Sequence, residues 1–152
     1  VSAISAQNIG AGKIARARAT LHYATAIDVA FAPMSSFVRQ LYAPETISLF
    51  TDEPRVIVLG SQYLRSYVWD CVFAGIHFCY SGVFCACGLS IISFIHNVLS
   101  MACVRIPMAY ITSASYPDTL YPMGWASPAG SLLSVIICVG VYVYLNKRHR
   151  CL

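Results

Sequence analysis

Long apolar stretches separated by short polar turns dominate the chain and predict membrane-spanning helices. A spanning helix needs roughly 20 mostly apolar residues, and four windows reach that length, at about 19–42, 62–87, 90–111 and 120–145. Glycine and proline signals that end helices lie between the windows, at Gly10, Gly12, Gly88 and Pro117. The residues before Gly10 are expected to be the end of a further apolar helix. The sequence therefore predicts an all-α membrane protein with four spans and an N-terminal helix stub.

Composition agrees with a lipid environment and excludes two other classes of protein. Hydrophobic residues make up 58% of the chain and charged residues only 11%, whereas soluble domains carry about 25% charged residues. Disordered chains are polar and charged, so disorder is excluded. The net charge of +4 is modest, and the basic residues form no stripe interleaved with aromatic residues, so no nucleic-acid partner is expected. We expect membrane lipid to surround the helices.

Two short basic clusters predict how the chain is oriented in the membrane. They consist of Lys13, Arg16 and Arg18 before the first window, and of Lys147, Arg148 and Arg150 after the last. Basic residues next to spans favour the cytoplasmic side, and four spans put both clusters there. The acidic loop at 44–55 then lies outside. We expect a multi-pass protein of a bacterial plasma membrane with a cytoplasmic C-terminus.

The cysteines and the missing enzyme motifs argue against metal binding and catalysis. Six of the seven cysteines lie inside apolar stretches, Cys151 being the exception, and are expected to act as small buried residues. The group of His77, Cys79, Cys85 and Cys87 fits no zinc spacing. No nucleophile, metalloprotease or phosphate-loop motif occurs. A membrane-embedded enzyme using Asp70, His77 and Cys79 is an alternative, but Cys79 falls on the other face of the predicted helix.

Asp70 is the strongest functional candidate, because it lies within the second window. A carboxylate inside a membrane costs at least about 2.5 kcal/mol and marks a functional site by default. Residues three, four, seven and eleven positions away share its helix face; the polar ones are Tyr63, Ser66, Tyr67, His77 and Ser81. Such a carboxylate can exchange a proton, a sodium ion or an organic cation. The alternative is a structural salt bridge with Arg39, Arg65 or Arg105.

Four polar residues within the windows are weaker candidates. Asn97 in the third window is expected to line a cavity or to bond across helices. His77 and His96 are candidate proton relays, with simple hydrogen bonding as the alternative. Asp28 in the first window is a second acid, expected nearer the cytoplasmic end and in a structural role.

Four stretches, in order along the chain, resemble the multidrug and toxic compound extrusion (MATE) family. They are Ala6–Lys13 with Arg16 and Arg18, similar to "AQNxGAGKxxRA"; Ile47–Pro54, similar to an "LFT-D-P" loop; Tyr63–Tyr67 with Asp70 and Ser81-Gly82; and Arg105-Ile-Pro107 with Tyr110. The ordered set carries the resemblance, because no single motif is diagnostic.

The resemblance implies a fold and a transport function. Members have twelve helices in two six-helix lobes, and this chain (residues 1–152) would cover the end of helix eight through helix twelve, a part of the C-terminal lobe. The missing N-terminal lobe of the same chain would then be its partner. The family exports cationic or amphipathic compounds in exchange for Na⁺ or H⁺, by alternating access to a cavity between the lobes. Export of a lipid-linked precursor and a non-functional truncated remnant are the alternatives.

The resemblance also implies a cation site on the family's tenth helix. In several members an acid and a tyrosine on that helix help to bind the coupling cation. Asp70 stands where these members carry the tyrosine, one turn before their acid, and Ala74 takes the place of the acid. One turn moves a residue about 5.4 Å along the axis but keeps the helix face. The predicted cation- or substrate-binding set is Asp70, Tyr67, Ser66, Tyr63, His77 and Asn97, with Na⁺ or H⁺ as coupling ion and no resident cofactor.

Overall fold

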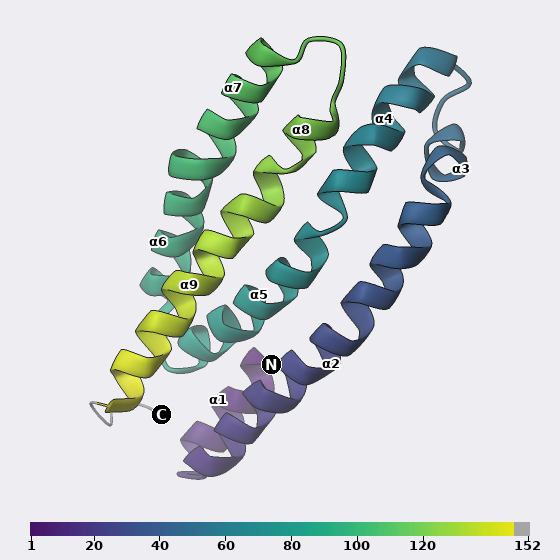
Figure 1. The fold of residues 1–152 in the computed structure, drawn as a ribbon. Coiled ribbons are helices and arrows are strands. Elements are labelled where there is room, and N and C mark those ends of the chain that lie inside the picture. The colour runs from purple at the N-terminus through teal and green to yellow at the C-terminus, as the bar shows by residue number, and fades with distance from the viewer. Residues whose placement is uncertain (148–152) are drawn as a thin grey trace.

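The computed structural model describes residues 1–147, and every regular element in this range is helical, as the sequence predicts. The elements are α1 (Ser2–Gly10), α2 (Ile14–Leu41), α3 (Ala43–Ser48), α4 (Pro54–Tyr67), α5 (Asp70–Ala86), α6 (Ser90–Ser100), the π-helical turn η1 (Met101–Arg105), α7 (Ile106–Ser115), α8 (Tyr121–Gly124) and α9 (Ala126–Lys147). Figure 1 shows an elongated bundle in which the long helices run up and down between two ends.

Two glycines close the turns at one end of this bundle. Gly12 follows α1 with φ 70°, and Gly88 follows α5 with φ 74°. This left-handed conformation is open to glycine because it has no Cβ. The chain reverses at both positions, so that α1 runs back along α2 and α5 runs back along α6 (Figure 1). Both turns lie where the sequence predicts them.

The spans differ in how clearly they suit a membrane. Two stretches are long and apolar enough to cross it, 90–115 (α6, η1 and α7 together) and 121–147 (α8 and α9). A third passes if α4 and α5, which meet at an angle of 45°, form one bent span. The predicted first window forms the 28-residue helix α2, but α2 is not apolar enough to meet the same criterion. The four-span topology therefore stays a prediction.

The polar residues that lower the hydropathy of α2 have a structural use at the break between α4 and α5. Ser36 Oγ donates a hydrogen bond to the carbonyl of Val68 (3.3 Å), and Gln40 Nε2 donates to the carbonyl of Arg65 (2.5 Å). A sharp bend leaves carbonyls without their helical partners, and inserted side chains can satisfy them. The predicted single helix at 62–87 is thus two helices that bend at Val68 and Trp69.

Helix α5 lies at the centre of the bundle, between α2 and α1 on one side and α6 and α9 on the other (Figure 1). Two small apolar clusters hold it there. The cluster towards α2 is formed by Ala17, Leu21 and Val83, and the cluster towards α9 by Phe84, Cys138 and Leu145. Helix α5 is thus the inner helix of the bundle.

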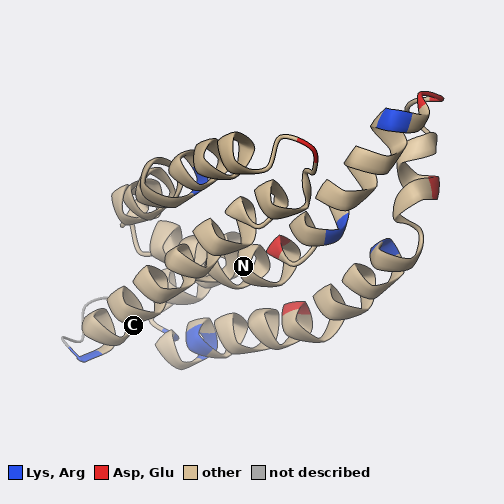
Figure 2. Cartoon of the chain, turned by 45° about the horizontal axis from the view of Figure 1, so that its top comes forward, with Lys and Arg blue, Asp and Glu red and all other residues tan. Residues whose placement is uncertain are grey.

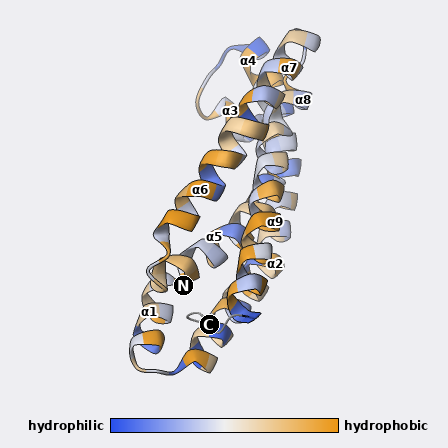
Figure 3. Ribbon diagram, turned by 90° about the vertical axis from the view of Figure 1, so that its left-hand side faces the viewer, coloured by the Kyte–Doolittle hydropathy of each residue, from blue (hydrophilic) through white to orange (hydrophobic). Residues whose placement is uncertain are grey.

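The outward faces of the helices are apolar, as expected for contact with lipid. Phe31 on α2 is 62% exposed and Phe94 on α6 is 68% exposed. Figure 3 shows hydrophobic residues along the shafts of α2, α6 and α9, and Figure 2 shows long stretches without charge. Of the cysteines expected to be buried, Cys138 is buried, but Cys85 and Cys103 lie on these exposed faces. Lipid contact explains them, because a free thiol behaves as a small apolar group.

The first predicted basic cluster and Lys147, the one described residue of the second, lie at the same end of the bundle. The turn that contains Lys13 and the end of α9 at Lys147 lie together at the lower end of Figure 1, and α3 and the loop after α7 lie at the other end. Arg148, Arg150 and Cys151 lie outside the described residues. The arrangement agrees with an even number of crossings between the clusters.

Candidate functional site

Asp70 is the first residue of α5 and lies directly after the bend. Only 6% of the residue is exposed. The start of a helix favours an acidic side chain, because the backbone N–H groups there carry a partial positive charge. The bend therefore places a carboxylate inside the bundle at a helix terminus, where an unbroken helix would offer no free N–H groups.

Arg105 is the ionic partner of Asp70, one of the three arginines predicted for that role. Arg105 Nη2 lies 3.7 Å from Asp70 Oδ1. This separation exceeds the 2.7–3.2 Å range of an N–H···O hydrogen bond, and Asp70 Oδ1 has no hydrogen-bond partner among the described residues. The two charges thus attract each other without a closed hydrogen bond between them.

Helix α9 fixes Arg105 from the other side. Arg105 Nη2 also donates to Ser131 Oγ at 2.7 Å, and Ser100 Oγ donates to the carbonyl of Gly130 at 2.6 Å. A Cβ on Gly130 would lie 2.5 Å from Arg105 Cγ, so only glycine leaves room for this side chain. Arg105 ends the π-helical turn η1, and such turns occur often at functional sites.

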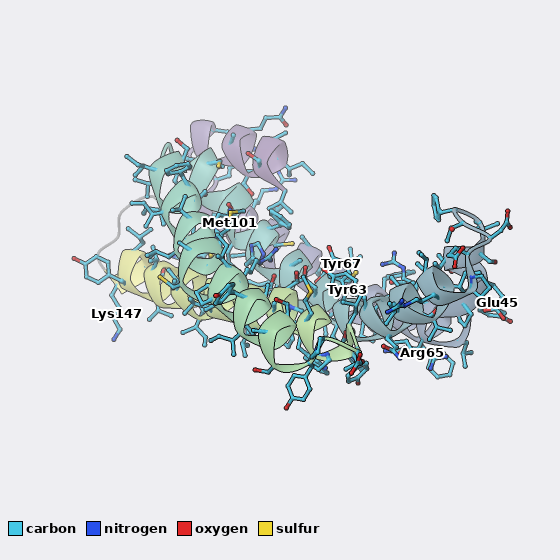
Figure 4. The ribbon with its side chains drawn as sticks, turned by 90° about the horizontal axis from the view of Figure 1, so that it is seen from above. Glu45, Tyr63, Arg65, Tyr67, Met101 and Lys147 are labelled. Carbon is cyan, nitrogen blue, oxygen red and sulfur yellow. The ribbon has the colours of Figure 1, made fainter. Side chains whose placement is uncertain are left out.

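The two predicted tyrosines lie on α4 before the bend, and Tyr67 is the one near Asp70. The rings of Tyr63 and Tyr67 stack with centroids 5.6 Å apart and planes 17° apart. Figure 4 shows them next to each other near the middle of the molecule, whereas Glu45 lies at its far end. Tyr67 lies within electrostatic range of both Asp70 and Arg105. The aromatic pair therefore borders the ionic pair.

Ser66, predicted to share a helix face with Asp70, lies near the end of α4, just before the bend. Its Oγ donates to the carbonyls of Tyr63 (3.0 Å) and Gln62 (3.3 Å) within α4. It packs against Gly124 of α8, where a Cβ would collide with Ser66 Oγ. The structure thus gives Ser66 a packing role between α4 and α8.

His77 and His96 face each other across the interface between α5 and α6. Their ring centroids are 5.6 Å apart and their planes 74° apart. The residues are 1% and 0% exposed, and none of their four ring nitrogens has a hydrogen-bond partner among the described residues. An unpaired buried polar group costs about 1–3 kcal/mol, so the pair destabilises the fold. This cost makes the pair a candidate for a function.

Asn97 lies apart from Asp70. Its Nδ2 donates to the carbonyl of Ser93 (3.1 Å) in its own helix, and the residue is exposed. It borders a cavity of about 260 Å³ along α6 and η1, lined by Phe94, Asn97, Val98, Ser100, Met101 and Arg105. Of the residues predicted to accompany Asp70, Tyr67 lies near it and Tyr63 stacks on Tyr67. His77 lies deeper along α5, Ser66 packs against α8, and Asn97 is exposed on α6.

Sequence reasoning missed the contribution of α9, namely Gly130, Ser131 and Ser134. Ser134 Oγ donates to the carbonyl of His96 (3.5 Å). Their spacing is the one available signal, because small residues on one helix face permit close helix packing in membranes. Among the described residues, no group of three or more His, Cys, Asp or Glu side chains is placed to hold a metal ion.

Comparison with known proteins gives one match. A family model described as MatE matches residues 1–111. This range is more than half of the chain and includes the ionic pair, the tyrosine pair and the histidine pair, but not α8 and α9. Neither the curated proteins nor the solved structures contain a match.

Proposed function

Because the chain belongs to the MATE family of membrane transporters, we propose that it forms part of an ion-coupled antiporter that exports cationic or amphipathic compounds. The coupling ion is Na⁺ or H⁺, and Asp70 is the carboxylate that binds it or the organic cation. The remaining lobe of the same chain completes the transport pathway, in a bacterial plasma membrane with the C-terminus in the cytoplasm.

The observation that carries this proposal is the open ionic pair of Asp70 and Arg105. At 3.7 Å the pair lacks a direct hydrogen bond, and Arg105 has a second partner in Ser131. When a proton or a cation neutralises Asp70, Arg105 loses its counter-ion. The guanidinium keeps its hydrogen bond to Ser131. Exchange of one cation for another at a single carboxylate is the step that antiport requires.

Two further features support the proposal. The ring of Tyr67 lies near the carboxylate and stacks on the ring of Tyr63, and aromatic faces attract organic cations. The bent pair α4 and α5 places Asp70 at a helix terminus inside the bundle. Discontinuous helices form the binding sites of many secondary transporters.

Export of a lipid-linked precursor, the alternative within the family's wider group, has less support. It would be favoured by a lateral opening lined by both Arg39 and Arg105. Arg39 instead donates to Cys71 Sγ (3.1 Å), and Arg105 turns inwards to Asp70. Neither the cavity beside Asn97 nor the two cavities along α4 are lined by both arginines.

The test is export of a fluorescent cationic dye from cells that carry the full-length chain, with Asp70→Asn compared with the unaltered protein. Export is measured with a proton gradient alone and with a Na⁺ gradient alone, and normalised to protein in the membrane. We expect Asp70→Asn to abolish ion-driven export. Asp118→Asn, in the exposed loop after α7, is the matched control and should export normally. Unchanged export by Asp70→Asn would contradict the proposal.

A further inference from the structure

Polar groups pair level by level along the interface between α5 and the antiparallel stretch of α6 and η1. Asp70 lies opposite Arg105 (3.7 Å), His77 lies opposite His96 (ring centroids 5.6 Å apart), and Ser93 Oγ donates to the carbonyl of Ser81 (3.1 Å). We call these residues the polar file. An apolar interface would suit a membrane helix equally well, so the repeated pairing of polar groups needs an explanation.

The polar file leads from one end of the bundle to Asp70. From Ser81 to Asp70 the file covers eleven residues of α5, about 16 Å at 1.5 Å per residue. Beyond Ser81, Cys85 Sγ donates to Ser93 Oγ (3.6 Å), one turn before the Gly88 turn at the end of the bundle. The file therefore reaches from near this turn to the ionic pair.

The interior of the file is closed off from its surroundings. His77 and His96 are the most buried of its side chains, and their four ring nitrogens have no partner among the described residues. Two neutral imidazoles carry two N–H groups and two free lone pairs between them. Groups of this kind, unpaired and buried, are suited to receive and pass on a proton, whereas purely structural histidines would be hydrogen-bonded.

The charged groups around the histidine pair come from two elements. Asp70 lies two turns away on α5, and Arg105 on η1 lies within electrostatic range of His77. Helix α9 contributes Ser134, whose hydroxyl bonds to the carbonyl of His96. On α2, Asp28 lies against Gly75, on another face of α5. The positive charge of Arg105 opposes a second positive charge at the pair, which favours onward transfer of a proton to Asp70.

We propose that the polar file conducts protons between the Gly88 turn and Asp70, with His77 and His96 as the groups that hold the proton in transit, and that the coupling ion is therefore H⁺. This inference rests on the proposed function and deepens it. A proton that binds the free nitrogen of an imidazole is balanced by loss of the N–H proton from the other nitrogen to the next acceptor. Each ring then ends as its other tautomer without net charge. Bridging water carries the proton over the roughly 10 Å along α5 between His77 and Asp70, and Asp70 accepts it and releases Arg105.

The experiment compares His77→Gln and His96→Gln with His22→Gln in the full-length transporter. His22 lies on an exposed face of α2 and is the matched control. Dye export driven by a proton gradient should fall about 100-fold in both buried variants, the lower end of what a positioned proton carrier contributes. The residual export should respond less to an imposed pH gradient than export by the unaltered protein, because glutamine cannot accept a proton on one nitrogen and release one from another. Export by His22→Gln should match the unaltered protein.

A second measurement uses the unaltered protein and so does not depend on the folding of any variant. Adding substrate to the purified transporter in Na⁺-free, weakly buffered solution should release protons in proportion to the protein. Absence of proton release, or export driven equally well by Na⁺ alone, would overturn the inference.

The two proposals fail in different ways. If Asp70→Asn abolishes export while both histidine variants keep proton-driven export and its pH profile, the polar file is structural and only this inference is wrong. If Asp70→Asn itself exports normally, the proposed function is wrong as well.

Discussion

Two acidic side chains lie on different faces of α5, one from α5 itself and one from α2, and their surroundings differ. Asp70 belongs to α5 itself and meets Arg105 on the side of η1 and α9. Asp28 comes from α2 and rests against Gly75, and its Oδ2 has no hydrogen-bond partner among the described residues. The same residue type is thus a member of an ionic pair on one face and an uncompensated group on the other.

The contrast shows that an acid within a membrane helix is not enough to define a site. Its neighbours decide whether its charge is compensated. Both acids depend on a glycine, Gly130 for the side chain of Arg105 and Gly75 for the carboxylate of Asp28. On the Asp70 side, the glycine makes room for a counter-ion. On the Asp28 side, it makes room for the carboxylate alone. Four substitutions test this contrast.

Removing the counter-ion should have the largest effect on stability. Arg105→Gln leaves Asp70 buried without its partner. Breaking a buried pair costs about 3–5 kcal/mol, and because the side chain of Arg105 is 34% exposed we expect about 2 kcal/mol after allowing for solvent screening. Thermal unfolding of the purified full-length protein measures the loss. Arg39→Gln, at an exposed arginine that contacts Cys71, is the control and should change little. Equal losses in both variants would show that Arg105 does not stabilise Asp70.

Filling the space beside Arg105 should have the next largest effect. Gly130→Ala puts a Cβ 2.5 Å from Arg105 Cγ and 2.9 Å from Ser100 Oγ. Overpacking of this kind costs about 1–3 kcal/mol, and we expect about 1.5 kcal/mol. Gly140→Ala on the same helix meets nothing within 4 Å and should be neutral or stabilising, since alanine favours a helix. A stable Gly130→Ala variant, measured in the same unfolding assay, would mean that α9 does not hold Arg105 in place.

Neutralising the unpaired acid should act in the opposite direction. Asp28→Asn keeps the shape of the side chain and removes a charge that has no basic partner among the described residues. Because an unpaired buried charge is unfavourable, we expect a gain of about 1 kcal/mol. Asp70→Asn, measured in parallel, should not stabilise, because it leaves Arg105 without a counter-ion. A loss of stability in Asp28→Asn would mean that the charge of Asp28 is compensated after all, and the contrast with Asp70 would be wrong.

The smallest effect should come from the bend that positions Asp70. Ser36→Ala removes the hydrogen bond to the carbonyl of Val68, worth about 0.5–1.5 kcal/mol; at 3.3 Å we expect about 0.5 kcal/mol. Ser35→Ala is the matched control, because Ser35 Oγ bonds to Ala32 within its own helix. Its unfolding temperature should stay unchanged, and an equal drop in both variants would argue against a special role of Ser36 at the bend.

Much of the fold follows from the sequence because its signals are local. The apolar windows predict the helices, and the glycines at Gly12 and Gly88 predict the turns, since backbone conformation and hydropathy act within one segment. The bend at Val68 and Trp69 could not be predicted in this way. It carries no proline, and the donors that satisfy its carbonyls come from α2, at separations of 32 and 25 residues along the chain.

The candidate site divides along the same line. The sequence by itself determined that this is a helical membrane protein and that Arg105 is one of three possible partners of Asp70. It also marked Asp70 as a functional candidate, because a carboxylate inside a membrane carries an energetic cost. Only the tertiary structure decided that Arg105 is the partner, that Ser66 turns to α8, and that His77 meets His96. A pairing between helices depends on which faces meet and at what depth, and this is set by packing between segments, whereas hydropathy and helix signals act within a single segment.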